Sequence, residues 1–106
     1  MEREELQVIA FQIIAHSGDA RDLIHKAFSL MREYKFDEAL KQLDAANEAV
    51  ILAHRSQTNM LSKYAGGEEI VMEIIMVHAQ DHLMTTINLY EVALEVLEIY
   101  KQLAKK

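Results

Sequence analysis

Val77-His78-Ala79-Gln80-Asp81-His82-Leu83-Met84-Thr85 lies in a segment that runs from about Glu68 to the C-terminus without glycine or proline. Such a segment predicts one long helix. The residues within about 60° of His78 on a helical wheel form what we call the His78 face. This face consists of Val71, Ile74, Ile75, His78, Asp81, His82, Thr85, Leu89, Val92 and Val96. Because most of the face is aliphatic, we expect it to be buried.

The His78 face also carries two imidazoles, a carboxylate and a hydroxyl. Burying ionisable groups costs several kcal/mol unless they are paired, hydrogen-bonded or bound to metal. A fold that accepts this cost usually does so for chemistry, so the sequence predicts a functional site here.

A second apolar face of the same helix lies between about 100° and 180° from His78. It consists of Met72, Met76, Ala79, Leu83, Ile87, Tyr90, Leu94 and Leu97. An outer helix of a three-helix monomer needs an apolar stripe only a little wider than about 100°. The surplus predicts a second interface, and self-association around a rotation axis is its simplest origin in so small a chain.

The rest of the chain predicts two more helices. The first runs from about Glu2 to Arg32 and has Gly18 inside its periodic pattern, which suggests a close approach by another element. The second begins at Asp37, a predicted N-cap, and ends at Gly66-Gly67. The third then begins at Glu68. Short connections predict an all-α, antiparallel up-down-up three-helix bundle, with residues 1–106 as one domain.

Composition excludes several classes of function. The 106 residues include no cysteine, which rules out disulfides, thiolate metal sites and a cysteine nucleophile. No apolar run approaches the roughly 18 residues that span a membrane, and the acidic first residues do not resemble a signal peptide. A net charge of -6 without a basic cluster argues against nucleic acid and anionic membranes. We therefore expect a cytoplasmic protein with protein partners.

The His78 face supports three interpretations. Since His78 and His82 are one helical turn apart, both rings can reach one point, and Asp81 shares their face. A neutral imidazole could attack and carry a phosphoryl group. His-x-x-x-His with a carboxylate could bind a metal. The histidines could instead simply be hydrogen-bonded in a core.

Two well-known motifs are excluded. A zinc protease of the His-x-x-x-His kind has glutamate directly after its first histidine, where this chain has Ala79. Gly66-Gly67 lacks the lysine and hydroxyl residue of a phosphate-binding loop. Any phosphoryl group must therefore come from another protein or bind transiently.

The stretch Val77–Thr85 resembles the signature of the lactose/cellobiose-type IIA component of the bacterial sugar phosphotransferase system. Three further stretches are similar to that family: Gly18-Asp19-Ala20-Arg21, Ala53-His54-Arg55-Ser56-Gln57-Thr58 and Ala65-Gly66-Gly67-Glu68. The resemblance covers essentially the whole chain and favours the phosphocarrier over a helical adaptor or a metal-binding bundle. Asp19 departs from the family, which commonly has asparagine there.

The resemblance implies a helical homotrimer that passes phosphate from the general phosphocarrier protein to the sugar-specific IIB component of a permease. It implies that His78 is phosphorylated and that Asp81 lies near the threefold axis, where three copies share a divalent cation, usually magnesium. Three such carboxylates would repel one another without a cation between them. The sugar itself, of the cellobiose, lactose or chitobiose type, is not specified.

The remaining polar residues have weaker expectations. His82 and Gln80 are candidates for orienting the His78 ring or contacting phosphate oxygens, although Gln80 could face solvent. The Thr85 hydroxyl is expected to bond to the preceding helical turn. His54 and Gln57 are expected on the inward side of the second helix, preferably as a hydrogen-bonded core pair and otherwise as part of a polar layer with the polar residues of the third helix. Two more histidines, His16 and His25, are expected at the surface or its boundary.

Overall fold

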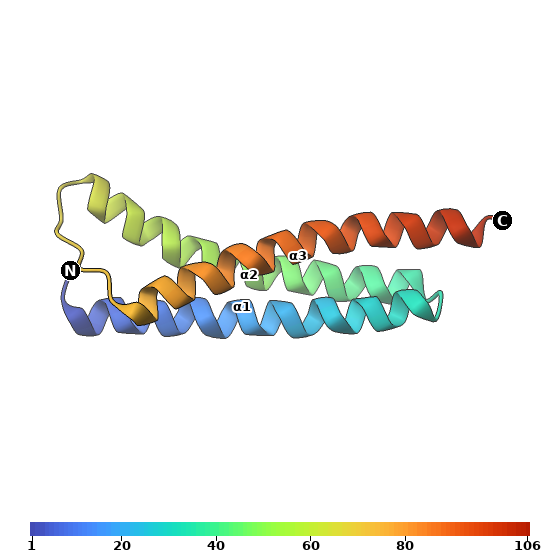
Figure 1. Ribbon diagram of the computed structural model, residues 1–106, viewed down its shortest axis with the longest axis horizontal. Coiled ribbons are helices and arrows are strands. Elements are labelled where there is room, and N and C mark those ends of the chain that lie inside the picture. Colours follow the sequence, from blue (N-terminus) through green and yellow to red (C-terminus); the bar gives the residue numbers. More distant parts are fainter.

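The computed structural model describes all 106 residues and contains three helices and no strand. They are α1 (Arg3–Arg32), α2 (Phe36–Ala65) and α3 (Ile74–Ala104). The helices run up, down and up in an elongated bundle of 57 × 20 × 19 Å (Figure 1). The predicted helical architecture is thus confirmed. None of these helices has the apolar length that crossing a bilayer requires.

The core consists of two apolar clusters arranged along the bundle. One contains Ala20, Ile24, Ala27, Met31, Ala39, Leu43, Ala46, Val50, Ala93 and Leu97. The other contains Leu6, Ala10, Ile13, Ala53, Met60, Met76, Ala79 and Leu83. On α1 and α3 the clusters are separated in sequence by Ser17 and Thr86, the two fully buried polar residues. The functional residues of α3 lie close to this polar level.

Replacing Leu83 with Ala is expected to lower the free energy of unfolding by about 2–5 kcal/mol, the usual cost of truncating a fully buried leucine. Leu83 is completely buried in the second cluster. Urea or thermal unfolding followed by circular dichroism measures the change. Met84→Ala is the matched control because Met84 is 49% exposed. Equal destabilisation by both substitutions would contradict this assignment of the core.

The second apolar face of α3 is buried in the bundle, whereas much of the His78 face is exposed. Its buried residues are Met76, Ala79, Leu83, Thr86, Ala93 and Leu97, most of which belong to the second apolar face. On the His78 face, Ile74 is 89% and Val92 is 54% exposed, and His78, Asp81 and Thr85 are exposed as well. The prediction that the His78 face is buried within the bundle was therefore wrong. The surplus apolar surface is real, but it lies around His78.

The start of α3 also differs from the prediction. The helix begins at Ile74 instead of Glu68, and residues 68–73 form no helix. In Figure 1 the end of α2 diverges from α1, so this segment must cross back to α1. An extended chain covers about 3.3 Å per residue against about 1.5 Å in a helix. Ile70 packs on the second core cluster, and the Arg3 guanidinium pairs with Glu73 at 3.0 Å.

Gly66-Gly67 ends α2 as predicted, and Gly67 adopts a φ of 96° that favours glycine. The start of α2 lies slightly before the predicted N-cap. Lys35 precedes the first helical residue, Phe36, and Asp37 lies within the first turn, where its charge suits the helix dipole. Phe36 packs against the first core cluster, which explains why the helix begins there.

Candidate functional site

The His78 and His82 rings lie one turn apart on α3 and are nearly parallel. Their centroids are 6.1 Å apart, and their planes differ by 6°. His78 is exposed, whereas His82 is half-buried. His82 is half-buried because its ring lies against α1, beside Gly18. The pair therefore presents one accessible imidazole and one held against the bundle.

Gly18 on α1 provides the space beside His82. A Cβ atom built on Gly18 would lie 3.9 Å from His82 Nε2, which is an ordinary contact distance for a methyl group. A longer side chain pointing the same way would meet the ring. His82 is thus the neighbour of Gly18 on α3, at a distance that would also accommodate alanine.

Thr85 and Thr86 connect the histidine turn of α3 to α1. The Thr86 hydroxyl donates to the His82 carbonyl at 2.7 Å. The Thr85 hydroxyl lies 2.9 Å from the Asp81 carbonyl and 3.2 Å from that of His82, which confirms its expected bond to the preceding turn. Both hydroxyls also accept hydrogen bonds from Arg21, at 2.8 Å for Thr85 and 3.4 Å for Thr86.

The pKa of His82 lies below its ordinary value. Burial is the main cause, and the positive charges of Arg21 and His78 act in the same direction, while Asp81 opposes them. The imidazole of His82 is therefore held toward the neutral form. A neutral imidazole has one nitrogen that donates and one that accepts a hydrogen bond. His82 can thus orient a neighbouring group without placing a positive charge beside His78.

Gln80 faces α2 instead of solvent. Its side-chain oxygen accepts a hydrogen bond from Gln57, and its nitrogen lies 3.6 Å from Met76 Sδ. His54, the other half of the pair predicted inside the bundle, is exposed. The predicted His54–Gln57 pair was therefore wrong, because Gln57 reaches α3 while His54 points outward. His25 is exposed and His16 half-buried, as expected for surface and boundary residues.

Asp81 is exposed on the His78 face and belongs to none of the ion pairs of the chain. No set of three or more carboxylates and imidazoles within one chain could hold a metal ion. Within one chain His78, Asp81 and His82 therefore do not form the metal site that their spacing allowed. A carboxylate oxygen is a suitable ligand for magnesium, but the remaining ligands would have to come from other copies or from water.

Arg21 and Thr86 are the site residues that sequence reasoning did not identify. Arg21 belongs to one of the stretches that resembled the family, but it received no role. A useful signal was its position next to Ala20 on the buried side of α1 and one turn after Ser17. A cation there must find polar partners on a neighbouring helix.

Taken together, the site offers an exposed imidazole beside a half-buried one, on a largely apolar surface. Ile74, Val77 and Val92 contribute exposed apolar side chains to this surface of α3. A partner protein that covers it would exclude water from the imidazole. This arrangement suits the transfer of a hydrolysable group between two docked proteins.

The chain is similar to known proteins over almost its whole length. The profile of the family described as "PTS system, Lactose/Cellobiose specific IIA subunit" matches residues 8–101. The lactose-specific EIIA component of Staphylococcus epidermidis is 41% identical over 102 residues, covering 96% of this chain and 98% of that protein. The Lactococcus lactis component with the same name is 41% identical over 105 residues, covering 99% of this chain and all of that protein.

Solved structures show the same similarity. PtcA from S. mutans is 56% identical with a TM-score of 0.94, covering 95% of this chain and 99% of that chain. The cellobiose-specific enzyme IIA of Bacillus anthracis is 36% identical with a TM-score of 0.92, covering 100% and 95%. The chitobiose IIA of Escherichia coli, solved in complex with HPr, is 30% identical with a TM-score of 0.81, covering 98% and 99%.

Proposed function

Because the chain belongs to the lactose/cellobiose-specific IIA family of the sugar phosphotransferase system, we propose that it carries a phosphoryl group on His78. The donor is the general phosphocarrier protein, HPr, and the acceptor is the sugar-specific IIB component. The observation that carries this proposal is the exposed His78 imidazole stacked on the half-buried His82. The E. coli relative that was solved with HPr supports the choice of donor.

Each of the two steps of the relay, from the donor to His78 and from His78 to IIB, is a displacement at phosphorus. A neutral ring nitrogen of His78, we propose Nε2, forms a P–N bond as the bond from phosphorus to the donor's nitrogen breaks. The donor imidazole keeps the electron pair of that bond. In the second step the nucleophile of IIB attacks the same phosphorus, and His78 leaves as a neutral imidazole. His82 is the candidate for orienting the ring or the phosphate oxygens. Gln80 would have to exchange its partner Gln57 on α2 to reach them.

Incubation with phosphoenolpyruvate, enzyme I and HPr tests this function. Intact-protein mass spectrometry should show the gain of one phosphoryl group, labile to acid and stable to base as a phosphohistidine is. Omitting HPr should prevent the gain. If the wild-type chain remains unmodified while a lactose IIA relative is phosphorylated in the same mixture, the proposed function is refuted.

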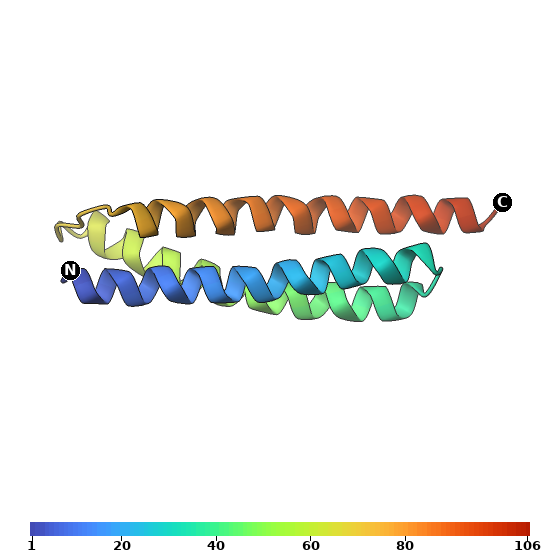
Figure 2. The same cartoon turned by 60° about the horizontal axis from the view of Figure 1, so that its bottom comes forward.

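We infer self-association, with a trimer as the assembly that the family resemblance implies. The support is the exposed apolar surface of α3, which includes Ile74, Val92, Ile99 and Leu103. In Figures 1 and 2 the last turns of α3 extend beyond the turn that joins α1 to α2. This end of α3 therefore has apolar surface that its own chain does not cover, and contiguous surface of this kind usually marks an interface.

We further propose that Asp81 from three copies binds a shared magnesium ion, which would offset the repulsion between the carboxylates. Magnesium at one hundred times its dissociation constant is expected to stabilise the assembly by about 2.7 kcal/mol. Asp81→Asn should abolish the response to magnesium and to a chelator, as measured by thermal unfolding. Asp22→Asn, an exposed change on α1, should retain it. A magnesium response that survives Asp81→Asn would contradict the proposal.

The sugar is determined outside this chain, since the carrier hands phosphate to IIB and does not bind sugar. Its relatives are named for lactose and for cellobiose, so we propose a β-disaccharide of the lactose, cellobiose or chitobiose type. The phosphoryl donor and acceptor of this relay work on the cytoplasmic side of the permease, and we propose the cytoplasm as the location. Purifying the IIB component that accepts phosphate from His78 identifies the transport system.

A further inference from the structure

Arg21 is a half-buried cation that connects α1 to α3 next to the histidine pair. Its Nη2 donates to Thr85 Oγ1 at 2.8 Å, and both Nε and Nη2 lie 3.4 Å from Thr86 Oγ1. No carboxylate pairs with it, although Asp19 and Asp22 are close in sequence on α1. All its side-chain partners are therefore neutral hydroxyls of α3.

These hydroxyls pass the contact on to the functional turn. Thr86 donates to the His82 carbonyl, and the Thr85 hydroxyl lies within hydrogen-bond distance of the Asp81 and His82 carbonyls. A single threonine side chain thus links Arg21 to the backbone of Asp81 and His82. A shift of the guanidinium would release the hydroxyls and with them the turn that sets the direction of the His82 ring.

The electrostatics of this region also indicate a role beyond packing. Partial burial of a guanidinium costs solvation free energy. Hydrogen bonds to neutral hydroxyls compensate this cost less than hydrogen bonds to a carboxylate would. The charged or titratable groups that act on His82 are Arg21, His78 and Asp81. The cation lacks a carboxylate partner of its own, and a phosphoryl group on His78 would bring negative charge to this surface.

We propose that Arg21 is a positioning residue of the phosphoryl site: it fixes the His82 turn of α3 against α1, so that His82 is correctly placed when His78 accepts phosphate. This inference rests on the proposed phosphocarrier function. The guanidinium fork matters because it reaches two hydroxyls at once, which the single ammonium group of lysine reproduces poorly. The positive charge of Arg21 also favours the negative charge of a phosphoryl group on His78.

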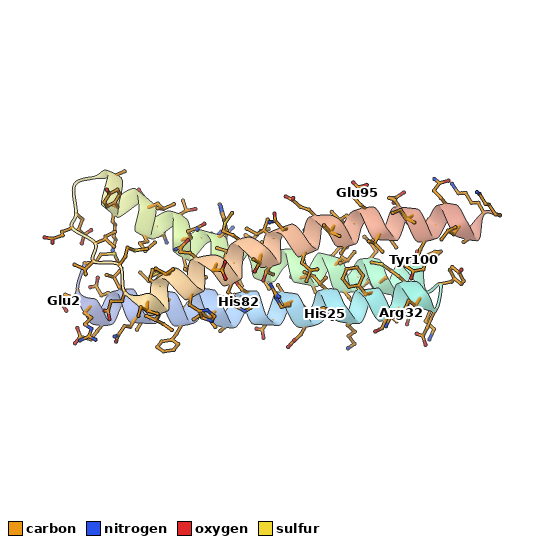
Figure 3. All side chains as sticks on the ribbon, in the orientation of Figure 1. Glu2, His25, Arg32, His82, Glu95 and Tyr100 are labelled. Carbon is orange, nitrogen blue, oxygen red and sulfur yellow. The ribbon has the colours of Figure 1, made fainter.

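The test compares Arg21→Gln and Arg21→Lys with the matched control Arg32→Gln. Arg32 lies near the far end of the same helix, as Figure 3 shows, and its side chain bonds only to Ser29 of its own helix. Initial rates of phosphoryl transfer from HPr are measured at several HPr concentrations, on protein shown by circular dichroism to be folded. For Arg21→Gln we expect kcat to fall between about tenfold and a hundredfold, the range for misplaced groups, while KM for HPr is unchanged.

Arg21→Lys should restore part of the lost kcat because it retains the charge, and Arg32→Gln should match the wild type. A purely structural role would lower the melting temperature without this selective loss of kcat. Wild-type kcat in folded Arg21→Gln, or a change confined to KM, would overturn the proposal. If wild type is not phosphorylated at all, the proposed function fails instead, so the two failures are distinguishable.

An experiment on the unmutated protein covers the case in which the variants do not fold. The Nε–H signal of Arg21 in ¹⁵N-labelled protein should shift when His78 is phosphorylated, since the phosphoryl group brings negative charge to the surface beside the guanidinium. The Arg32 Nε–H signal should stay in place. An Arg21 signal that is unaffected by phosphorylation would overturn the proposal.

Discussion

His78→Ala is expected to abolish phosphoryl uptake completely while leaving the fold intact. The ring nitrogen is the only proposed point of covalent attachment, and no neighbouring group can replace a nucleophile that has been removed. His82, the nearest imidazole, is half-buried against α1, where burial lowers its pKa, and it is less accessible to a donor protein than His78. Since His78 is exposed, its removal creates no cavity, and the melting temperature should change little. Mass spectrometry after incubation with the phosphoryl donor measures the loss.

His54→Ala is the matched control for this experiment. His54 is also an exposed histidine, but it lies on α2 and outside the site. The variant should accept one phosphoryl group at the wild-type rate. Acid-labile, base-stable phosphorylation of His78→Ala, or its loss in His54→Ala, would show that the carrier has been assigned to the wrong histidine.

Val92→Asp is expected to convert the proposed trimer into monomers at micromolar concentration. Val92 is 54% exposed in the single chain and lies on the His78 face, about four helical turns beyond His78, so contact between copies would bury it. Each subunit would then bring an unpaired carboxylate into an apolar interface, at a cost of several kcal/mol per charge. Within a folded monomer the same side chain remains in water. Light scattering coupled to size-exclusion chromatography measures the change in mass.

Leu52→Asp provides the comparison for the assembly experiment. Leu52 is 46% exposed on α2, so the substitution places the same new charge at a similarly exposed apolar position away from α3. This variant should keep the wild-type mass. A wild-type chain that is already monomeric, or a Val92→Asp protein with unchanged mass, would contradict the proposed interface. Circular dichroism should show that both variants retain their helices.

Much of the fold follows from local signals in the chain. The interval from Arg3 to Arg32 is periodic throughout, and α1 occupies it. Gly66-Gly67 ends α2 because glycine supports the turn that leaves a helix, and Gly67 takes a positive φ there. The start of α3 did not follow from such signals, because Glu68 to Glu73 favour a helix locally but must instead extend to reach α1. Tertiary geometry overrode local preference in that segment.

The sequence predicts which residues of α3 share a face, but not which residues of the other helices contact them. The spacing of His78 and His82 alone places their rings on one side of a helix. The partner helices supply Arg21 beside His82 and Gln57 beside Gln80, and neither contact can be derived from spacing along α3. The depth of burial that lowers the pKa of His82 likewise depends on how α1 packs against it.

From its sequence alone this protein was determined to be a helical bundle with an imidazole pair on a helix whose apolar surface exceeds what one chain can cover. Helical periodicity establishes which side chains share a face, because it depends only on the geometry of the backbone. It does not establish which of two apolar faces turns inward, since burial is a relation between helices. Only the tertiary structure decided that Met76, Ala79 and Leu83 face α1 and α2, which leaves His78 accessible to another protein.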